Sequence, residues 1–174
     1  MNEVLNAIKT RRSIRKFKPD MPDKALVDQV VEAGLYAASG KNSQETIILV
    51  VTNRELIAKM SEDNRRIGGF PEGSDPFFGA PMLLVVLGKK SRSTYKYDGS
   101  LVMGNLMLAA HALGQGSCWI HRAREEFEMP EYQKLLRDLG VEGEWEGIGH
   151  CLLGYPDSEG VWLERKAGRV FYVK

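Results

Sequence analysis

The chain has no excess of charge of either sign, since 24 lysines and arginines face 23 aspartates and glutamates and the formal net charge is +1. Proteins that bind nucleic acid usually carry a basic footprint over a whole face, so this balance gives no support for a nucleic-acid partner. The longest apolar stretch, residues 101–113, is too short to span a bilayer and contains an asparagine and a histidine. We therefore expect neither nucleic-acid binding nor a membrane-spanning segment.

Cysteine is also scarce, because the sequence has only Cys118 and Cys151, without the Cys-x-x-Cys spacing of redox and zinc motifs. Their number allows a disulfide, but the N-terminal residues lack the apolar segment of a secretory signal. Two reduced, buried thiols in a cytoplasmic protein are the expectation. The three histidines have no metal-ligand spacing, so we predict no metal site. His150 falls in a predicted strand and is expected to be structural.

No repeat, low-complexity run or Pro/Ser-rich linker divides the chain, so we predict one domain over residues 1–174. Apolar spacing and capping residues predict helices over residues 2–9, 22–39, 53–60, 98–113 and 130–139. Short apolar runs predict buried strands over residues 46–52, 82–87, 117–120 and 148–153. The Gly-, Pro- and Asp-rich stretch 63–81 predicts an irregular lid or binding loop. Interleaved helices and buried strands indicate a three-layer α/β or α+β domain, with the strand order left open.

The helix predicted from residue 98 to 113 is apolar nearly all round. A helix of this composition is expected to be buried on all sides. A single small domain has limited room for such a helix. We therefore expect part of its surface to lie at a subunit interface.

The strongest positive signal is a basic cluster, Arg11-Arg12-Ser13-Ile14-Arg15-Lys16-Phe17. On a chain of balanced charge, a local cluster favours a specific anion site over a general polyanion surface. In an extended segment, alternate side chains point to one side, which would align Arg11, Ser13 and Arg15. Guanidinium groups and a hydroxyl on one side suit a phosphate. Without further motifs, a solvated surface or charges at a helix C-terminus would explain the cluster equally well.

The cluster, directly after a first helix, resembles the opening motif of the nitroreductase family, whose members are flavoproteins that bind FMN. Three later segments are similar to further motifs of that family and occur in the same order. They are a small-residue loop after a helix, a central helix with its following strand, and a Gly-Tyr-Pro segment with basic residues behind it: residues 37–44, 105–120 and 149–156, with the basic residues at 165, 166 and 169. Four ordered motifs over most of the chain are fairly specific.

The resemblance implies an α+β fold with three α/β/α layers around a mostly antiparallel sheet. It also implies a homodimer with FMN sites at the interface and ping-pong reduction by NADH or NADPH. The electron acceptor would be a nitroaromatic, a quinone or a similar small molecule. Two alternatives within the resemblance are an FMN-binding or storage protein and a relative with divergent flavin chemistry, such as flavin fragmentation or reductive dehalogenation. A third alternative is an anion-responsive module without flavin.

The resemblance also implies roles for residues of the first motif and of the tail. Arg11, Arg12 and Ser13 correspond to phosphate and ribityl ligands. Arg15 corresponds to a cation beside the flavin N1–C2=O edge, where it would stabilise the reduced, anionic flavin. In the tail, Lys166 and Arg169 correspond to residues that complete the phosphate site.

The second motif and the strand that ends at Ile120 supply the remaining candidates. Ser39, Asn42 and Gln44, with Lys41 among them, correspond to ligands donated by the second subunit. The family presents a backbone N–H to flavin N5 after this strand, which places Ile120, His121 and Arg122 beside the ring. Many members have glycine here, so the bulky, charged pair at 121–122 would either close the ring face or bind an anionic substrate. No side chain is assigned as acid or base, because the flavin carries the chemistry.

Overall fold

The computed structural model describes residues 2–174 and contains one four-stranded antiparallel sheet. The strands are β1 (Thr46–Val51), β2 (Met82–Lys89), β3 (Gly116–Ile120) and β4 (Trp145–Gly154). They are arranged in the order β1-β2-β4-β3. The helices are α1 (Glu3–Thr10), α2 (Lys24–Leu35), α3 (Arg54–Gly68), α4 (Tyr95–Ala112), α5 (Ala123–Phe127) and α6 (Pro130–Asp138), with a short 3-10 turn η1 (Gly40–Asn42).

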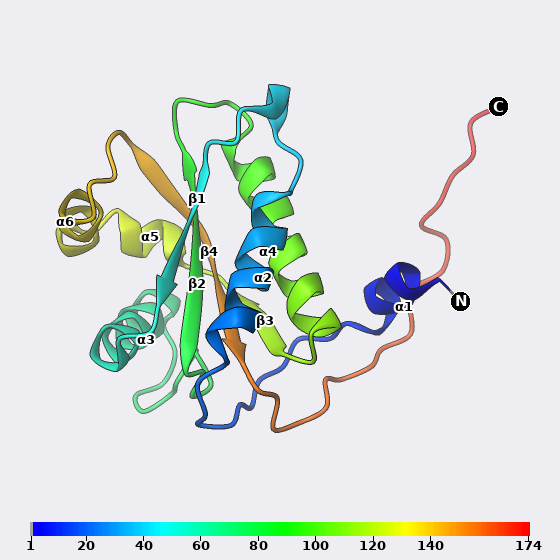
Figure 1. The fold of residues 1–174 in the computed structure, drawn as a ribbon, viewed down its shortest axis with the longest axis horizontal. Coiled ribbons are helices and arrows are strands. Elements are labelled where there is room, and N and C mark those ends of the chain that lie inside the picture. The colour runs from blue at the N-terminus through cyan, green and yellow to red at the C-terminus, as the bar shows by residue number, and fades with distance from the viewer. Residues whose placement is uncertain (1) are drawn as a thin grey trace.

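The sheet separates two apolar cores. Helices α2 and α4 lie on one face, while α3, α5 and α6 lie on the other (Figure 1). Successive side chains of a strand point to opposite faces, so a strand between two cores must be apolar at every position. In β2, Leu83 and Val85 belong to the core beneath α3, whereas Leu84 and Val86 belong to the core beneath α4. This explains why the run 82–87 was readable as a buried strand.

The first helix begins as predicted, because the Asn2 side chain accepts hydrogen bonds from the backbone N–H groups of Val4 and Leu5. Asn53 caps α3 in the same way through the Leu56 N–H. The predicted end of this helix at residue 60 was wrong, since α3 continues to Gly68 and the irregular loop begins only at Gly69.

Three further differences concern helices. Helix α2 spans residues 24–35 rather than 22–39, so the second motif lies outside it. Helix α4 begins at Tyr95, earlier than expected. The short helix α5 was not predicted at all, because five residues with three charges carry no clear apolar period.

The expectation that α4 is buried on all sides was wrong for the single subunit. Its inner face, with Val102, Met103 and Leu106, is buried against the sheet. Its outer face leaves half of the Leu101 side chain exposed. Composition alone could not separate a core-facing surface from one left open on the subunit.

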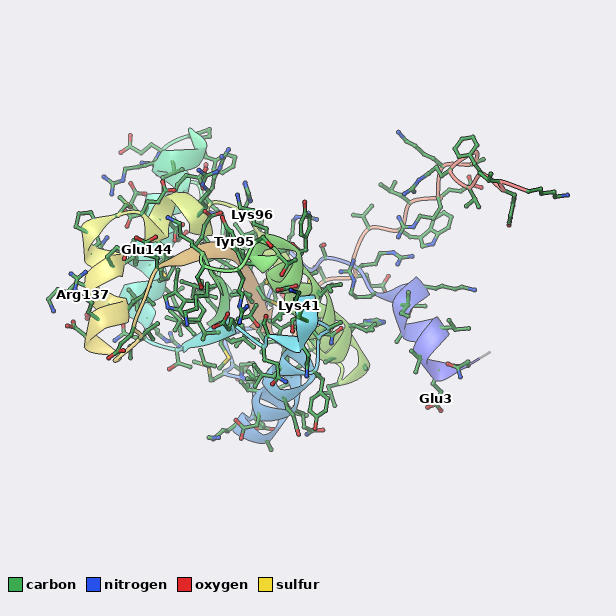
Figure 2. All side chains as sticks on the ribbon, turned by 90° about the horizontal axis from the view of Figure 1, so that it is seen from above. Glu3, Lys41, Tyr95, Lys96, Arg137 and Glu144 are labelled. Atoms are coloured by element: carbon green, nitrogen blue, oxygen red, sulfur yellow. The ribbon has the colours of Figure 1, made fainter. Side chains whose placement is uncertain are left out.

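The segment after β4 leaves the body of the protein. Residues 157–174 form no helix or strand, and they run past α1 before turning away from the sheet (Figure 1). Figure 2 shows α1 and this tail projecting on the same side of the molecule. The tail exposes the apolar side chains of Trp162, Phe171 and Val173, among others. No helix within residues 2–174 has the length and apolar content needed to cross a membrane.

Candidate functional site

The basic cluster is held as an irregular segment between the end of the sheet and the chain that follows β4. The Ile14 N–H donates to Ser117 O in β3 at 2.9 Å, and the Asp157 N–H donates to Lys16 O at 3.0 Å. Phe17 is buried and forms an isolated bridge with Pro156. As predicted, the cluster is not helical. Backbone contacts on both sides therefore fix the positions from which the arginine side chains of the cluster extend.

Two arginines of this cluster have buried N–H groups without an acceptor. Arg11 Nη1 and Arg12 Nε are inaccessible to solvent and have no hydrogen-bond partner within residues 2–174. Arg12 Nη1, in contrast, donates to Lys9 O at 2.8 Å and to Arg11 O at 2.7 Å. Burying a charged donor without a partner is costly, so these atoms are ready to bind an oxyanion. The donor set fits a phosphate group.

The positive charge of the cluster also acts on a neighbouring histidine. Thr10 Oγ1 lies 2.9 Å from His111 Nε2, which ties α1 to the end of α4. Burial lowers the pKa of His111, and the charges of Arg11 and Arg12 lower it further. The protein therefore keeps an additional cation away from a region already crowded with positive charge.

A cavity of about 400 Å³ lies where three separate parts of the chain meet. The basic cluster contributes Arg15, and the end of β3 contributes the run 119–122. Helix α3 contributes Asn64, and the loop behind it supplies Phe70 and Phe78. The structure thus brings Arg15 together with Ile120, His121 and Arg122, which are far from it in the sequence.

The turn after β3 has an unusual backbone. Arg122 has φ of +81° and ψ of 0°, a left-handed conformation that glycine adopts most easily. Its Nη1 lies 3.0 Å from Glu125 Oε1, so the side chain is directed back toward α5 rather than left free. His121 is exposed at the cavity edge. The bulky pair therefore borders the cavity without filling it.

The loop 69–81 closes another side of the cavity and is organised by one carboxylate. Asp75 Oδ1 accepts hydrogen bonds from Ser61 Oγ at 2.6 Å and from the Phe77 N–H at 2.9 Å, while Oδ2 accepts from the Gly79 N–H at 2.6 Å. Phe78 has φ of +53° and keeps an exposed aromatic ring at the cavity. A non-glycine residue in this conformation indicates strain, which is often found in segments that clamp a ligand.

The residues of the second motif do not join this site within one subunit. Ser39, Lys41, Asn42 and Gln44 lie around η1, at the end of the molecule opposite to the basic cluster (Figure 1). Figure 2 labels Lys41, which is well separated from α1. Their own contacts are local, since the Gln44 N–H donates to Ser39 Oγ at 3.1 Å and Gln44 Nε2 donates to Asn42 Oδ1 at 3.2 Å.

The tail residues Lys166 and Arg169 also lie outside the site of the single subunit. Both are exposed. The tail does approach the cluster earlier, because a Cβ added at Gly160 would lie 2.1 Å from Arg12 Cβ. It then leaves the body before reaching the two basic residues.

The two cysteines do not line the cavity. Cys118 and Cys151 are free and buried on neighbouring strands, and burial raises the pKa of Cys151 to about 12. Within residues 2–174 no group of three His, Cys, Asp or Glu side chains is arranged to hold a metal ion.

Three residues that line the cavity were not predicted from the sequence. They are Asn64, Phe70 and Phe78. The only sign of Asn64 in the sequence was a polar residue on the side of α3 that is buried.

Comparison with known proteins identifies the family. The model of the nitroreductase family matches residues 8–67 and 71–155. The chain belongs to the nitroreductase family. A relative from Archaeoglobus fulgidus whose name includes NAD(P)H nitroreductase is 33% identical over 165 residues, which cover 91% of this chain and 88% of the relative.

Solved nitroreductase structures have the same fold. The nitroreductase from Bacteroides fragilis, solved with bound FMN, superposes with a TM-score of 0.87 at 29% identity and with full coverage of both chains. A nitroreductase with bound FMN from Desulfitobacterium hafniense gives a TM-score of 0.89 at 26% identity, also with full coverage. The resemblance inferred from the ordered motifs is therefore confirmed, and so is the α+β class of the fold.

Proposed function

We propose that this nitroreductase-family protein is an FMN-dependent NAD(P)H oxidoreductase that reduces a nitroaromatic, a quinone or a similar small acceptor. The observation that carries the proposal is the pair of buried, unpartnered N–H groups on Arg11 and Arg12, in the same basic cluster as Arg15, which lines the cavity. A phosphate at the first two arginines would leave a planar ring system within reach of the third. The FMN-bound relatives and the nicotinamide-linked names of others support the same cofactor pair.

The residues of the chain bind and orient the cofactor. Arg11, Arg12 and Ser13 hold the phosphate and ribityl chain, and each charge-assisted hydrogen bond contributes roughly 1.5–3 kcal/mol. Arg15 stabilises negative charge at the N1–C2=O edge. The backbone N–H groups after Ile120 would be available to bind N5. FMN held by these residues would supply hydride transfer from NADH or NADPH and electron transfer to the acceptor, in a ping-pong cycle.

We further propose a homodimer of three-layer α/β/α subunits. An open apolar groove of about 500 Å³ is lined by Val4, Tyr36 and Leu108, between α1, α2 and α4. A second copy would cover this groove, the outer face of α4 and the apolar tail. It would also bring the partner's second motif, residues 39–44, to the basic cluster, and its tail would add Lys166 and Arg169. Sedimentation velocity of the full chain should show a dimer, and a monomer at micromolar concentration would refute this arrangement.

A storage protein for FMN is the second candidate, because the bulky, charged pair His121 and Arg122 lines the cavity at a position where many family members have glycine. The cytoplasm is the proposed compartment, since free thiols are typical of a reducing environment.

Steady-state turnover separates the two functions. FMN-loaded protein should oxidise NADH or NADPH with menadione or a nitroaromatic as acceptor, and double-reciprocal plots should be parallel. Tight FMN binding without reduction by either nicotinamide would refute the oxidoreductase and support storage.

A further inference from the structure

A polar network is buried beneath the turn that follows β3. It joins Asn64 of α3, Glu126 of α5 and His150 of β4, all with side chains at most 1% exposed. Asn64 Nδ2 donates to Glu126 Oε1 at 2.9 Å, and Glu126 Oε2 lies 2.9 Å from His150 Nε2. Phe77 of the loop 69–81 packs on the imidazole, with ring centroids 5.0 Å apart. Three elements and the loop are therefore joined at one point.

The hydrogen-bond partners indicate which ring nitrogen of His150 is protonated. His150 Nδ1 is buried without a partner, so a proton there would be an unsatisfied donor. The neutral tautomer with its proton on Nε2 avoids this cost and donates to Glu126. Each carboxyl oxygen of Glu126 then accepts one hydrogen bond. This leaves Asn64 as a donor in a fixed orientation.

The same asparagine holds the backbone of the turn. Asn64 Nδ2 also donates to His121 O at 2.7 Å. In a planar trans peptide the C=O and the following N–H point in opposite directions. The Arg122 N–H is therefore directed away from Asn64, and within residues 2–174 it donates no hydrogen bond. The left-handed backbone of Arg122, at φ +81°, is part of this orientation.

We propose that Asn64, Glu126 and His150 are positioning residues that hold the His121–Arg122 peptide so that its N–H is free to bind the flavin at N5. The proposal rests on the proposed function and adds the residues that aim this N–H. Asn64 acts directly on the peptide, while Glu126 and His150 act through Asn64. The competing explanation is a brace that only joins α3, α5 and β4.

A pair of substitutions on α3 separates the two explanations. Asn64→Leu keeps the number of side-chain heavy atoms and the branching at Cγ, and it removes both donated hydrogen bonds. The matched control is Asp63→Asn on the same helix, because Asp63 is equally buried, at 1% exposed. Its Oδ2 accepts hydrogen bonds from Tyr132 Oη at 2.7 Å and from Lys59 Nζ at 2.6 Å, and Asp63 has no hydrogen bond to the turn after β3. Both variants should lose stability. Only Asn64→Leu should lower the rate of flavin reduction by NADH, by about ten- to a hundredfold, because a small displacement of a reacting group has effects of this size.

The visible spectrum of bound FMN is a second readout of the pair, since a brace alone would not change it. It should shift in Asn64→Leu and stay unchanged in Asp63→Asn. Equal rates and equal spectra in the two variants would overturn the proposal. If FMN-loaded wild type is not reduced by either nicotinamide, the proposed function fails instead, and the comparison of spectra still tests the position of the peptide.

One measurement needs no variant. Amide hydrogen exchange of the wild-type full chain, followed by NMR, should show an unprotected Arg122 N–H that becomes at least about tenfold slower to exchange once FMN is added. Protection at Ser13 without any change at Arg122 would overturn the proposal, because FMN would then be bound without using this N–H.

Discussion

Arg11→Met tests the phosphate site through two quantities that can change independently: the Kd for FMN and the unfolding temperature of the FMN-free protein. Arg11 Nη1 is buried without an acceptor in the FMN-free protein, so the guanidinium contributes little there and costs free energy. Bound to a phosphate, it would make a charge-assisted hydrogen bond of roughly 1.5–3 kcal/mol. Losing that bond raises the Kd for FMN by about ten- to a hundredfold. The unfolding temperature of the FMN-free protein should stay the same or rise, because methionine fills the space without an unpaired donor.

Isothermal titration with FMN and thermal unfolding without it give the two numbers. The control is Lys134→Gln on α6, which removes the same charge from a surface pair with Asp138 at 2.6 Å and should leave both values unchanged. An FMN affinity unchanged in Arg11→Met would refute the reasoning. So would a loss of stability in the FMN-free protein as large as the loss of affinity, since Arg11 would then be structural.

Three further predictions concern single positions. Arg122→Gly should change the free energy of unfolding by less than about 1 kcal/mol, because relief of the left-handed strain offsets the flexibility of glycine in the unfolded chain; a larger loss in chemical denaturation would contradict this. Burial, then Arg11 and Arg12, lower the pKa of His111, so the folded protein binds this proton less readily than the unfolded chain does. Stability should therefore fall as the pH drops below the ordinary histidine value of 6.5, and His111→Gln should flatten this part of the pH profile of unfolding. Gly147→Ala should destabilise by roughly 1–3 kcal/mol in the same assay, because its Cβ would lie 2.2 Å from Ala123 O, and a neutral result would show that the β4–α5 contact is loose.

The parts of the fold that depend on local pattern could be predicted from the sequence. The run Met82–Leu87 is apolar at every position because β2 lies between two cores. Helix α3 was cut short because Asp63 and Asn64 occupy buried positions, where pattern analysis expects apolar residues. The cost of burying these polar groups is offset by hydrogen-bond partners far along the chain, such as Tyr132 for Asp63. No local signal announces such partners.

The residues of the candidate site likewise include some that the sequence predicts and some that it does not. Arg15 and the run 120–122 were identified from ordered motifs, and the structure places them around one cavity. The contribution of Asn64 could not be read from the sequence, because its hydrogen bond to His121 O joins residues 57 positions apart. The convergence of Phe70 and Phe78 depends on the path of an irregular loop. The outer face of α4 could not be predicted either, since an apolar helix sequence does not reveal whether each face of the helix packs against the same chain or against another.

We propose that the basic cluster and the cavity form an FMN site in which NADH or NADPH can reduce the bound flavin. The most direct test is the visible absorption spectrum of the full chain after incubation with excess FMN, dialysis, and anaerobic addition of NADH or NADPH. Our account predicts that flavin bands survive dialysis and are bleached by at least one nicotinamide. A colourless protein after dialysis would contradict the account at the level of the cofactor site, and retained bands that neither nicotinamide bleaches would contradict it at the level of the reaction.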